Sequence, residues 1–166
     1  MAINFADPAC ISNTKEKIFG ICDDPPPSNA PAYLDLTDDT KWIAWVDNDN
    51  EKNVVFTAID HCIEIKRPDG STESSCDGML QYDATIVFTE LKDRKSSGWL
   101  GKARDQLQIT IDTYKVNIGL QGFNRYYGYV ANKQRPSFKA GNLALAAKFE
   151  NDTGFILVID PVIKIH

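Results

Sequence analysis

Residues 79–91 decide the fold, and they read MLQYDATIVFTEL. Every second residue in this stretch belongs to one apolar face, which consists of Leu80, Tyr82, Ala84, Ile86 and Phe88. The intervening positions are mostly polar, namely Gln81, Asp83, Thr85 and Thr89, with Val87 as the apolar exception. A period of two is typical of a strand with one buried face. The stretch therefore predicts a long strand in a half-buried sheet.

The residues that follow predict one short helix and then further strands. Ser96 or Ser97 can cap a helix that ends near Leu107, in which Leu100 and Ala103 share a face with Leu107. Beyond it we expect two strand pairs, at residues 108–130 and 141–165. In the second pair an inward face is formed by Leu143, Leu145, Ala147 and Phe149. A turn at residues 151–154 then closes a hairpin onto residues 155–159.

Residues 1–41 predict an extended N-terminal arm, and residues 42–166 a single β-rich domain. Pro25, Pro26 and Pro27 favour a polyproline-like segment. Such a segment is either a strap across another surface or a solvated loop of its own domain. Further strands are expected at residues 42–46 and 53–66, followed by a turn in which Gly70 takes a positive φ. The fold class is mainly β: a β-sandwich or small β-barrel with one packed α-helix.

The composition is typical of a soluble globular domain of 166 residues, with 43% hydrophobic and 25% charged residues. The net charge of −5 argues against a protein that wraps nucleic acid. No apolar run approaches the roughly 20 residues of a membrane span, and the N-terminus does not predict a signal peptide. We therefore expect the four cysteines to be reduced and buried. They are Cys10, Cys22, Cys62 and Cys76.

The residue patterns predict no catalytic or metal site, and no cofactor. His61 and Cys62 are adjacent, so in a strand they face opposite ways and cannot form a dyad. Residues 47–51 resemble the start of a calcium loop, but Lys52 and Ala58 occupy the positions where such a loop needs glycine and glutamate. The sequence therefore predicts a protein that is not an enzyme.

Acidic residues concentrate between residues 35 and 51. Six acids lie there against one base, Lys41, and they are Asp35, Asp38, Asp39, Asp47, Asp49 and Glu51. The segment is either a solubilising loop or a face that repels polyanions. In the second case it would face passing DNA in a channel. A rival channel lining is the polar face around Asp83.

Aromatic residues cluster at residues 123–129, where Phe123, Tyr126, Tyr127 and Tyr129 surround Arg125. One interpretation is a stacking platform for single-stranded nucleic acid or sugar, which would make the protein a ligand-binding β module. The other is core packing or a contact between subunits.

The expected order of a long strand, a polar loop, a capped helix and two strand hairpins resembles the tail tube proteins of tailed bacteriophages. The resemblance covers roughly residues 53–165, and residues 1–41 fall outside it. It implies a virion structural protein, made in the host cytoplasm, that stacks as homo-oligomeric, hexameric rings around a DNA channel. DNA would pass without specific binding, other virion proteins would be partners, and no membrane would be involved. A head-to-tail connector or auxiliary capsid protein is the alternative.

Overall fold

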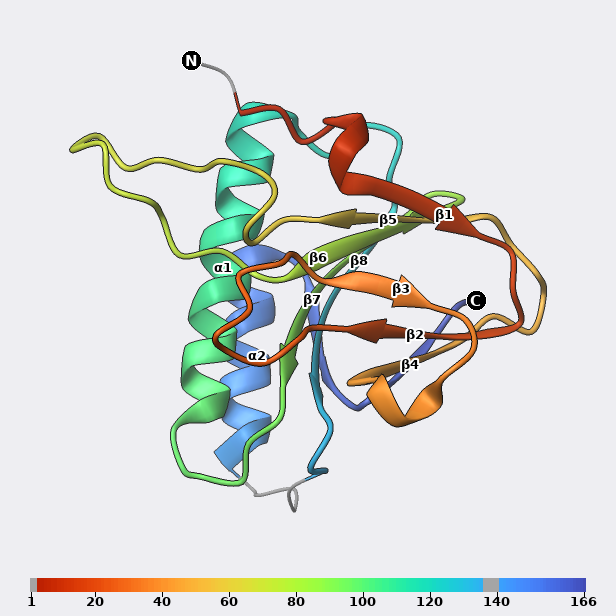
Figure 1. The fold of residues 1–166 in the computed structure, drawn as a ribbon. Coiled ribbons are helices and arrows are strands. Elements are labelled where there is room, and N and C mark those ends of the chain that lie inside the picture. Colours follow the sequence, from red (N-terminus) through yellow and green to blue (C-terminus); the bar gives the residue numbers. More distant parts are fainter. Residues whose placement is uncertain (1–2, 136–140) are drawn as a thin grey trace.

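A computed structural model describes residues 3–135 and 141–166 of the protein, as two β-sheets and two α-helices (Figure 1). The mainly-β class is therefore confirmed. Both sheets are open, so the described residues form no closed barrel. Neither described helix is long and apolar enough to cross a membrane.

The larger sheet has six strands. In order across the sheet they are β1 (Ile11–Thr14), β5 (Val54–Ala58), β6 (Gly78–Tyr82), β7 (Thr85–Lys92), β8 (Arg125–Asn132) and β9 (Ile156–Ile159). Strands β1, β5, β6 and β7 pair antiparallel, whereas β7, β8 and β9 pair parallel. The carboxyl ends of β7, β8 and β9 therefore meet at one edge of the sheet.

The long strand expected at residues 79–91 is a hairpin of β6 and β7 instead. Its turn contains Asp83, which has a φ of 49°. The turn reverses the chain so that Phe88 pairs with Met79 and shares its face, opposite to that of Leu80. The alternation was therefore correctly interpreted as strand, but it did not mark a single face. Val87, the apolar exception, is buried because both faces of β7 are covered.

The smaller sheet contains two strands from the segment that was expected to be an N-terminal arm. Its strands, in order, are β10 (Val162–Lys164), β4 (Ala44–Asp47), β2 (Ile18–Cys22) and β3 (Tyr33–Asp35). Short 3-10 helices lie at η1 (Pro8–Cys10) and η2 (Asp39–Lys41). The prediction of an arm at residues 1–41 is wrong, because β1, β2 and β3 pair within the two sheets.

Two stretches where further strands were expected are helical instead. Helix α1 (Trp99–Asn117) runs ten residues beyond the expected end at Leu107, and α2 (Gly141–Thr153) replaces the strand expected through Leu143 and Phe149. The buried residues of α1 recur at helical spacing: Ala103, Leu107, Thr110, Ile111 and Tyr114. The expected turn at residues 151–154 is the end of α2, where the Gly154 N–H donates to the Glu150 carbonyl at 2.8 Å.

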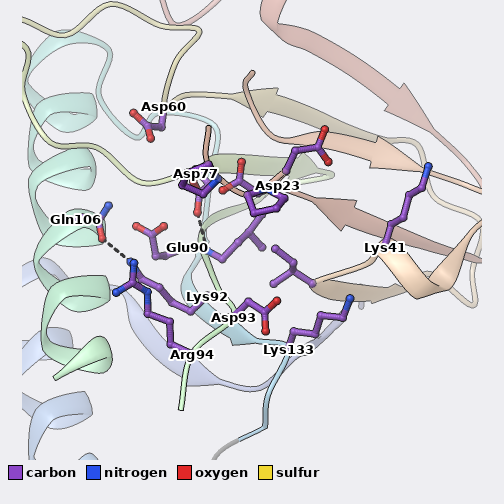
Figure 2. Close-up of a pocket in the computed structure, with 15 residues that line it drawn as sticks. Asp23, Lys41, Asp60, Asp77, Glu90, Lys92, Asp93, Arg94, Gln106 and Lys133 are labelled. Carbon is purple, nitrogen blue, oxygen red and sulfur yellow. Dashed lines mark hydrogen bonds between the residues drawn. The ribbon is translucent and has the colours of Figure 1, made fainter. Parts of the chain in front are cut away.

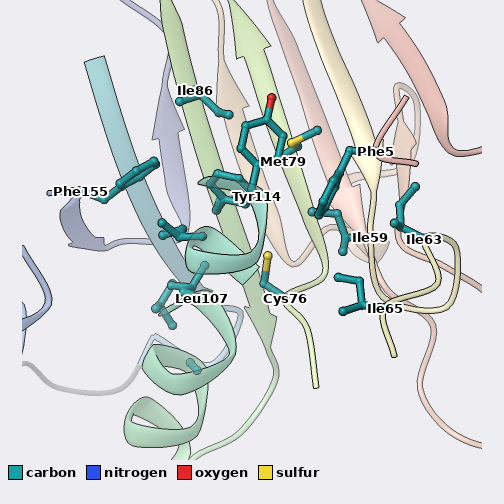
Figure 3. Close-up of a cluster of buried hydrophobic side chains, with 14 of the residues drawn as sticks. Phe5, Ile59, Ile63, Ile65, Cys76, Met79, Ile86, Leu107, Tyr114 and Phe155 are labelled. Atoms are coloured by element: carbon teal, nitrogen blue, oxygen red, sulfur yellow. The ribbon is translucent and has the colours of Figure 1, made fainter. Parts of the chain in front are cut away.

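The six-stranded sheet is the middle of three layers. One core lies between it and the helices and includes Leu107 and Tyr114 of α1, with Tyr114 beside Met79 (Figure 3). The second core lies between the two sheets and includes Phe19 and Ile163 of the smaller sheet. Close packing leaves no room at Gly20, because a Cβ there would come within 1.9 Å of the Trp42 ring.

Candidate functional site

The pocket that gathers most charged side chains lies at the carboxyl end of β7, between the helices and the smaller sheet (Figure 2). Its volume is about 600 Å³. Ends of parallel strands are a common place for ligands, because loops there leave a crevice above the sheet. Six acidic and four basic side chains line it: Asp23, Asp24, Asp60, Asp77, Glu90 and Asp93, with Lys41, Lys92, Arg94 and Lys133.

Glu90 and Asp77 form the floor of this pocket. Glu90 is the sixth residue of β7 and is 2% exposed, while Asp77 directly precedes β6 and is 7% exposed. The Leu91 N–H donates to Oδ2 of Asp77 at 2.7 Å, which fixes that carboxylate beside the end of β7. The Oε2 atom of Glu90 is buried without a hydrogen-bond partner. A buried oxygen without a partner is costly, so a proton shared with Asp77, a water molecule or a bound cation is expected at this atom.

Lys92 follows Glu90 by two residues, so both side chains leave the same face of β7. Its ammonium donates to Oε1 of Gln106 on α1 at 3.0 Å. Gln106 in turn donates to the Ser75 carbonyl at 3.3 Å. Figure 2 shows Lys92 turned toward Gln106, below the floor carboxylates. The Lys92 ammonium is therefore held in place next to the buried acids.

Asp60 and Asp23 complete the acidic side of the pocket. The backbone of residues 59–60 bonds to that of residues 76–77, through Ile59 N to Asp77 O at 2.9 Å. Burial, together with the nearby charge of Asp77 and then of Asp60, raises the pKa of Asp23 to about 6. Burial is also the main cause that raises the pKa of Asp60.

The pKa of Glu90 is raised as well. Burial, and next the like charge of Asp77, raise the pKa of Glu90 well above its ordinary value. Carboxylates whose pKa is raised by burial and by one another are typical of functional sites. They favour either proton sharing or a bound cation.

No three described His, Cys, Asp or Glu side chains form a group that could hold a metal ion by themselves. Mg²⁺, however, is usually held by only one or two carboxylates together with water and substrate phosphates. Asp77 and Glu90 are chemically suited to that partial role. The basic side chains around them are suited to an anionic substrate.

The predicted acidic residues lie elsewhere and do not converge on this pocket. Asp35 ends β3, and the Trp42 indole N–H donates to it at 2.8 Å; this bond is the main cause that lowers the pKa of Asp35. Asp38 caps η2, which contains Asp39. Asp47 lies in β4, and the turn after it exposes Asp49 and Glu51.

Asp83 is separate from the acidic segment in sequence but lies beside its end. In the turn between β6 and β7, it pairs with the Lys52 ammonium at 2.5 Å. Whether these acids line a channel stays a prediction.

The aromatic cluster is divided between the two faces of the larger sheet. Tyr126 faces the helices, packs 5.3 Å from Phe155 and donates to the Phe123 carbonyl at 2.6 Å. Tyr127 and Tyr129 face the smaller sheet, with their ring centroids 6.4 Å apart. A single stacking platform is therefore not present, because alternate residues of β8 point to opposite sides. Packing against the two cores accounts for the positions of these tyrosines, and their role in subunit contacts stays a prediction.

Two of the cysteines correct the prediction of four reduced thiols. Cys10 and Cys62 form a disulfide, which joins η1 to the turn after β5. Cys22 and Cys76 are buried free thiols, as expected. His61 lies in the same turn, exposed and with a φ of 63°, and its Nε2 is 3.4 Å from Asp60.

Sequence analysis missed the floor of the pocket because Asp77 and Glu90 meet only through the hairpin of β6 and β7, which was predicted as one continuous strand. One local signal was present: Glu90 is an acid near the end of a strand whose other positions are almost all apolar or small, and Lys92 follows at the same face. A charged pair at the carboxyl end of a buried strand is a stronger indication of a site than a run of exposed acids.

Comparison of the chain with protein-family models, with curated proteins and with solved structures found no match in any of the three.

Proposed function

We propose that the pocket is the active site of a hydrolase that cleaves phosphodiester bonds with the help of a divalent cation. The observation that carries this proposal is the buried Glu90 carboxylate, whose Oε2 has no partner, beside Asp77 and Lys92. The pocket combines hard oxygen donors with basic groups, and phosphoryl transfer needs both.

The cation would be held between Asp77 and Glu90. It would supply the missing partner of Glu90 Oε2 and offset the repulsion between the two carboxylates. Mg²⁺ fits this role because it keeps several water ligands and takes the rest from substrate phosphate oxygens. Two protein carboxylates are therefore sufficient.

The reaction would be attack of a water molecule on phosphorus. A divalent cation held by Asp77 and Glu90 would supply the Lewis-acid chemistry that activates the water and the phosphate. As the new P–O bond forms, the bond to the leaving oxygen breaks. The proton that the water loses passes to solvent, a proton from solvent goes to the leaving oxygen, and negative charge builds on the phosphoryl oxygens during the step. Lys92, which Gln106 holds in place, would stabilise that charge.

The remaining basic side chains would hold the substrate. Lys41 and Lys133 line the pocket away from the buried acids, and Arg94 lies beside Lys92 (Figure 2). Positive groups at the rim attract a polyanion that the chain as a whole, with a net charge of −5, would repel. Binding of the polyanionic substrate at the pocket is thus favoured over its nonspecific binding to the rest of the surface.

The test is cleavage of labelled oligonucleotides in the presence of Mg²⁺. We expect cleavage that EDTA abolishes and that Glu90→Gln lowers by at least about a hundredfold, the cost of removing one transition-state group. Asp49→Asn is the matched control, because it removes an exposed acid outside the pocket. Calorimetric titration with Mg²⁺ and Mn²⁺ should show binding that Glu90→Gln weakens. Activity that survives in Glu90→Gln, or no cation binding, contradicts the proposal.

This proposal departs from the predicted non-enzymatic role, and a second proposal keeps that role. In it the protein is a ring-forming virion subunit, a tail tube protein or a connector. The two open sheets favour it, because edge strands β1 and β9 carry the exposed Ile11 and Ile156 and can pair with other subunits.

The element order that suggested the tail tube resemblance is not the order of the fold. The described residues after α1 form β8, α2 and β9 rather than two hairpins. Electron microscopy of the purified protein over a concentration series tests assembly directly. Closed rings would support the second proposal, and a monomer at every concentration, alone and with virion partners, would contradict it.

A further inference from the structure

The floor of the pocket is recessed, which restricts what can reach it. Glu90 and Asp77 are 2% and 7% exposed, so a scissile phosphate has to enter the pocket to contact either. A phosphate of a duplex stays at the surface of a stiff, wide rod whose grooves are about 12 and 6 Å across. A phosphate of a single strand can be inserted, because its neighbours can fold away.

The walls of the pocket come from both sides of the molecule. One wall is the proline segment after β2, with Pro25 and Pro26, and the other is formed by Arg94 and Gln106. A bridge joins the two sides at one end: the Lys133 ammonium, after β8, donates to the Thr40 carbonyl of η2 at 2.7 Å. This bridge closes the pocket at that end.

A second recess of about 200 Å³ lies beside the first. The two are separated by Asn132, which lines the second, and Arg94, which lines the first. These residues share two hydrogen bonds, from Asn132 Nδ2 to the Arg94 carbonyl at 2.8 Å and from the Arg94 N–H to Asn132 Oδ1 at 3.3 Å. A nucleotide in the main pocket would therefore have its neighbour next to the second recess.

The chemistry of the second recess suits an unpaired base. Trp99 and Arg135 line it with Val130, Ile159 and Pro161. Aromatic and guanidinium groups stack on the faces of bases without regard to sequence. Only a base that is free of a complementary strand can turn into such a recess.

We infer that the substrate is a single-stranded polynucleotide, whose scissile phosphate enters the main pocket while an adjacent base occupies the recess at Trp99. This inference rests on the proposed function, since it names the substrate class of the same site. It also agrees with the acidic net charge, because duplex binding relies on an extended basic surface.

The experiment compares one labelled oligonucleotide, alone and annealed to its complement. Cleavage is measured with Mg²⁺, and affinity is measured separately by fluorescence anisotropy with Ca²⁺ in place of Mg²⁺. We expect the single strand to be cleaved faster and bound more tightly, each by at least about tenfold. Equal or better cleavage and binding of the duplex overturns the inference and leaves the hydrolase standing. Tighter single-strand binding without any cleavage supports the inference on the ligand and overturns the hydrolase.

Variants of the two recesses sharpen the result. Trp99→Ala should weaken single-strand binding about tenfold, within the range of one lost base stack, while Mg²⁺ binding is retained. Arg135→Ala removes an exposed side chain of the same recess and should also weaken single-strand binding, so it serves as the test in case Trp99→Ala does not fold. Lys133→Met removes the bridge to Thr40 and should reduce the ratio of single-strand affinity to duplex affinity. Lys15→Ala, which removes an exposed positive charge outside both recesses, is the control. Unchanged single-strand affinity in both Trp99→Ala and Arg135→Ala overturns the base recess.

Discussion

Two acidic regions of the molecule differ in how their charges are arranged. Residues 35–51 contain six acids in one short segment, and these are exposed or half-buried. The pocket collects Asp23, Asp60, Asp77 and Glu90 from four separate places in the chain and buries the last two. The first region is the more conspicuous in the sequence, whereas the second contains carboxyl groups whose pKa is raised by burial. A run of charged residues in the sequence is typical of a solvated surface. Charged side chains that a sheet brings together and buries, despite the free-energy cost of burial, indicate a functional site.

The largest expected difference between the two regions is in catalysis. Glu90→Gln should abolish the proposed cleavage, whereas Asp49→Asn should leave it unchanged. Equal losses in the two variants would show that general charge, rather than the pocket, matters. Steady-state cleavage of a labelled oligonucleotide measures both variants under one condition.

The disulfide should give the next largest effect, because it holds the turn that carries Asp60. It closes a loop with a sequence separation of 52, for which loop-closure entropy gives a stabilisation of about 4 kcal/mol. We expect Cys10→Ser with Cys62→Ser to lower the free energy of unfolding by roughly that amount in urea titrations. A reductant should act on the unsubstituted protein and not on this double variant. No change in either experiment would contradict the prediction.

A smaller effect is expected in how stability depends on pH. The pKa of Asp23 is raised from 3.8 to about 6, so the folded state binds a proton that the unfolded state releases between these values. The contribution of Asp23 to the free energy of unfolding should therefore fall as pH rises from about 4 to about 6 and then stay level. With EDTA present, Asp23→Asn should be more stable than the unsubstituted protein above about pH 6 and gain nothing below about pH 4. Thermal unfolding over this range measures it, and a gain that is independent of pH would contradict it.

The smallest effects are expected in the exposed acidic segment. Asp49→Asn and Glu51→Gln alter surface charges in a turn, so each should change the free energy of unfolding by less than about 0.5 kcal/mol. Urea titration at neutral pH is the measurement. A large loss in either variant would mean that this segment too depends on its charges, and the contrast with the pocket would fail.

The parts of the fold that sequence predicted correctly are those with local causes. The turn at residues 67–70 formed as expected, with the Gly70 N–H donating to the Arg67 carbonyl at 2.9 Å and a φ of 86° at Gly70. The strand now assigned as β9 was also found within one residue of its expected bounds. Both depend on residues that are neighbours in the chain.

The failures arose where a pattern fits two structures. Ile109 and Ile111 alternate as a strand would, but Leu107, Ile111 and Tyr114 also share one helical face, and packing against the sheet selects the helix. In the first 41 residues the three prolines suggested an arm, although the buried strand β2 directly precedes them. The pocket escaped for a related reason. Glu90 and Asp77 meet only because β6 and β7 pair as a hairpin, with Gly78 opposite Thr89, and the turn after β5 then adds Asp60.

The parallel pairing of β10 with β4 has a consequence for biosynthesis. Val162 lies opposite Trp45, and Ile163, which is fully buried, completes the core between the sheets. A ribosome delivers β4 long before it delivers β10, so the nascent chain carries an uncovered strand edge and an open apolar core during most of translation. The smaller sheet can close only after residue 164 has left the exit tunnel. Ribosome-bound chains should therefore stay sensitive to proteases until β10 has left the tunnel.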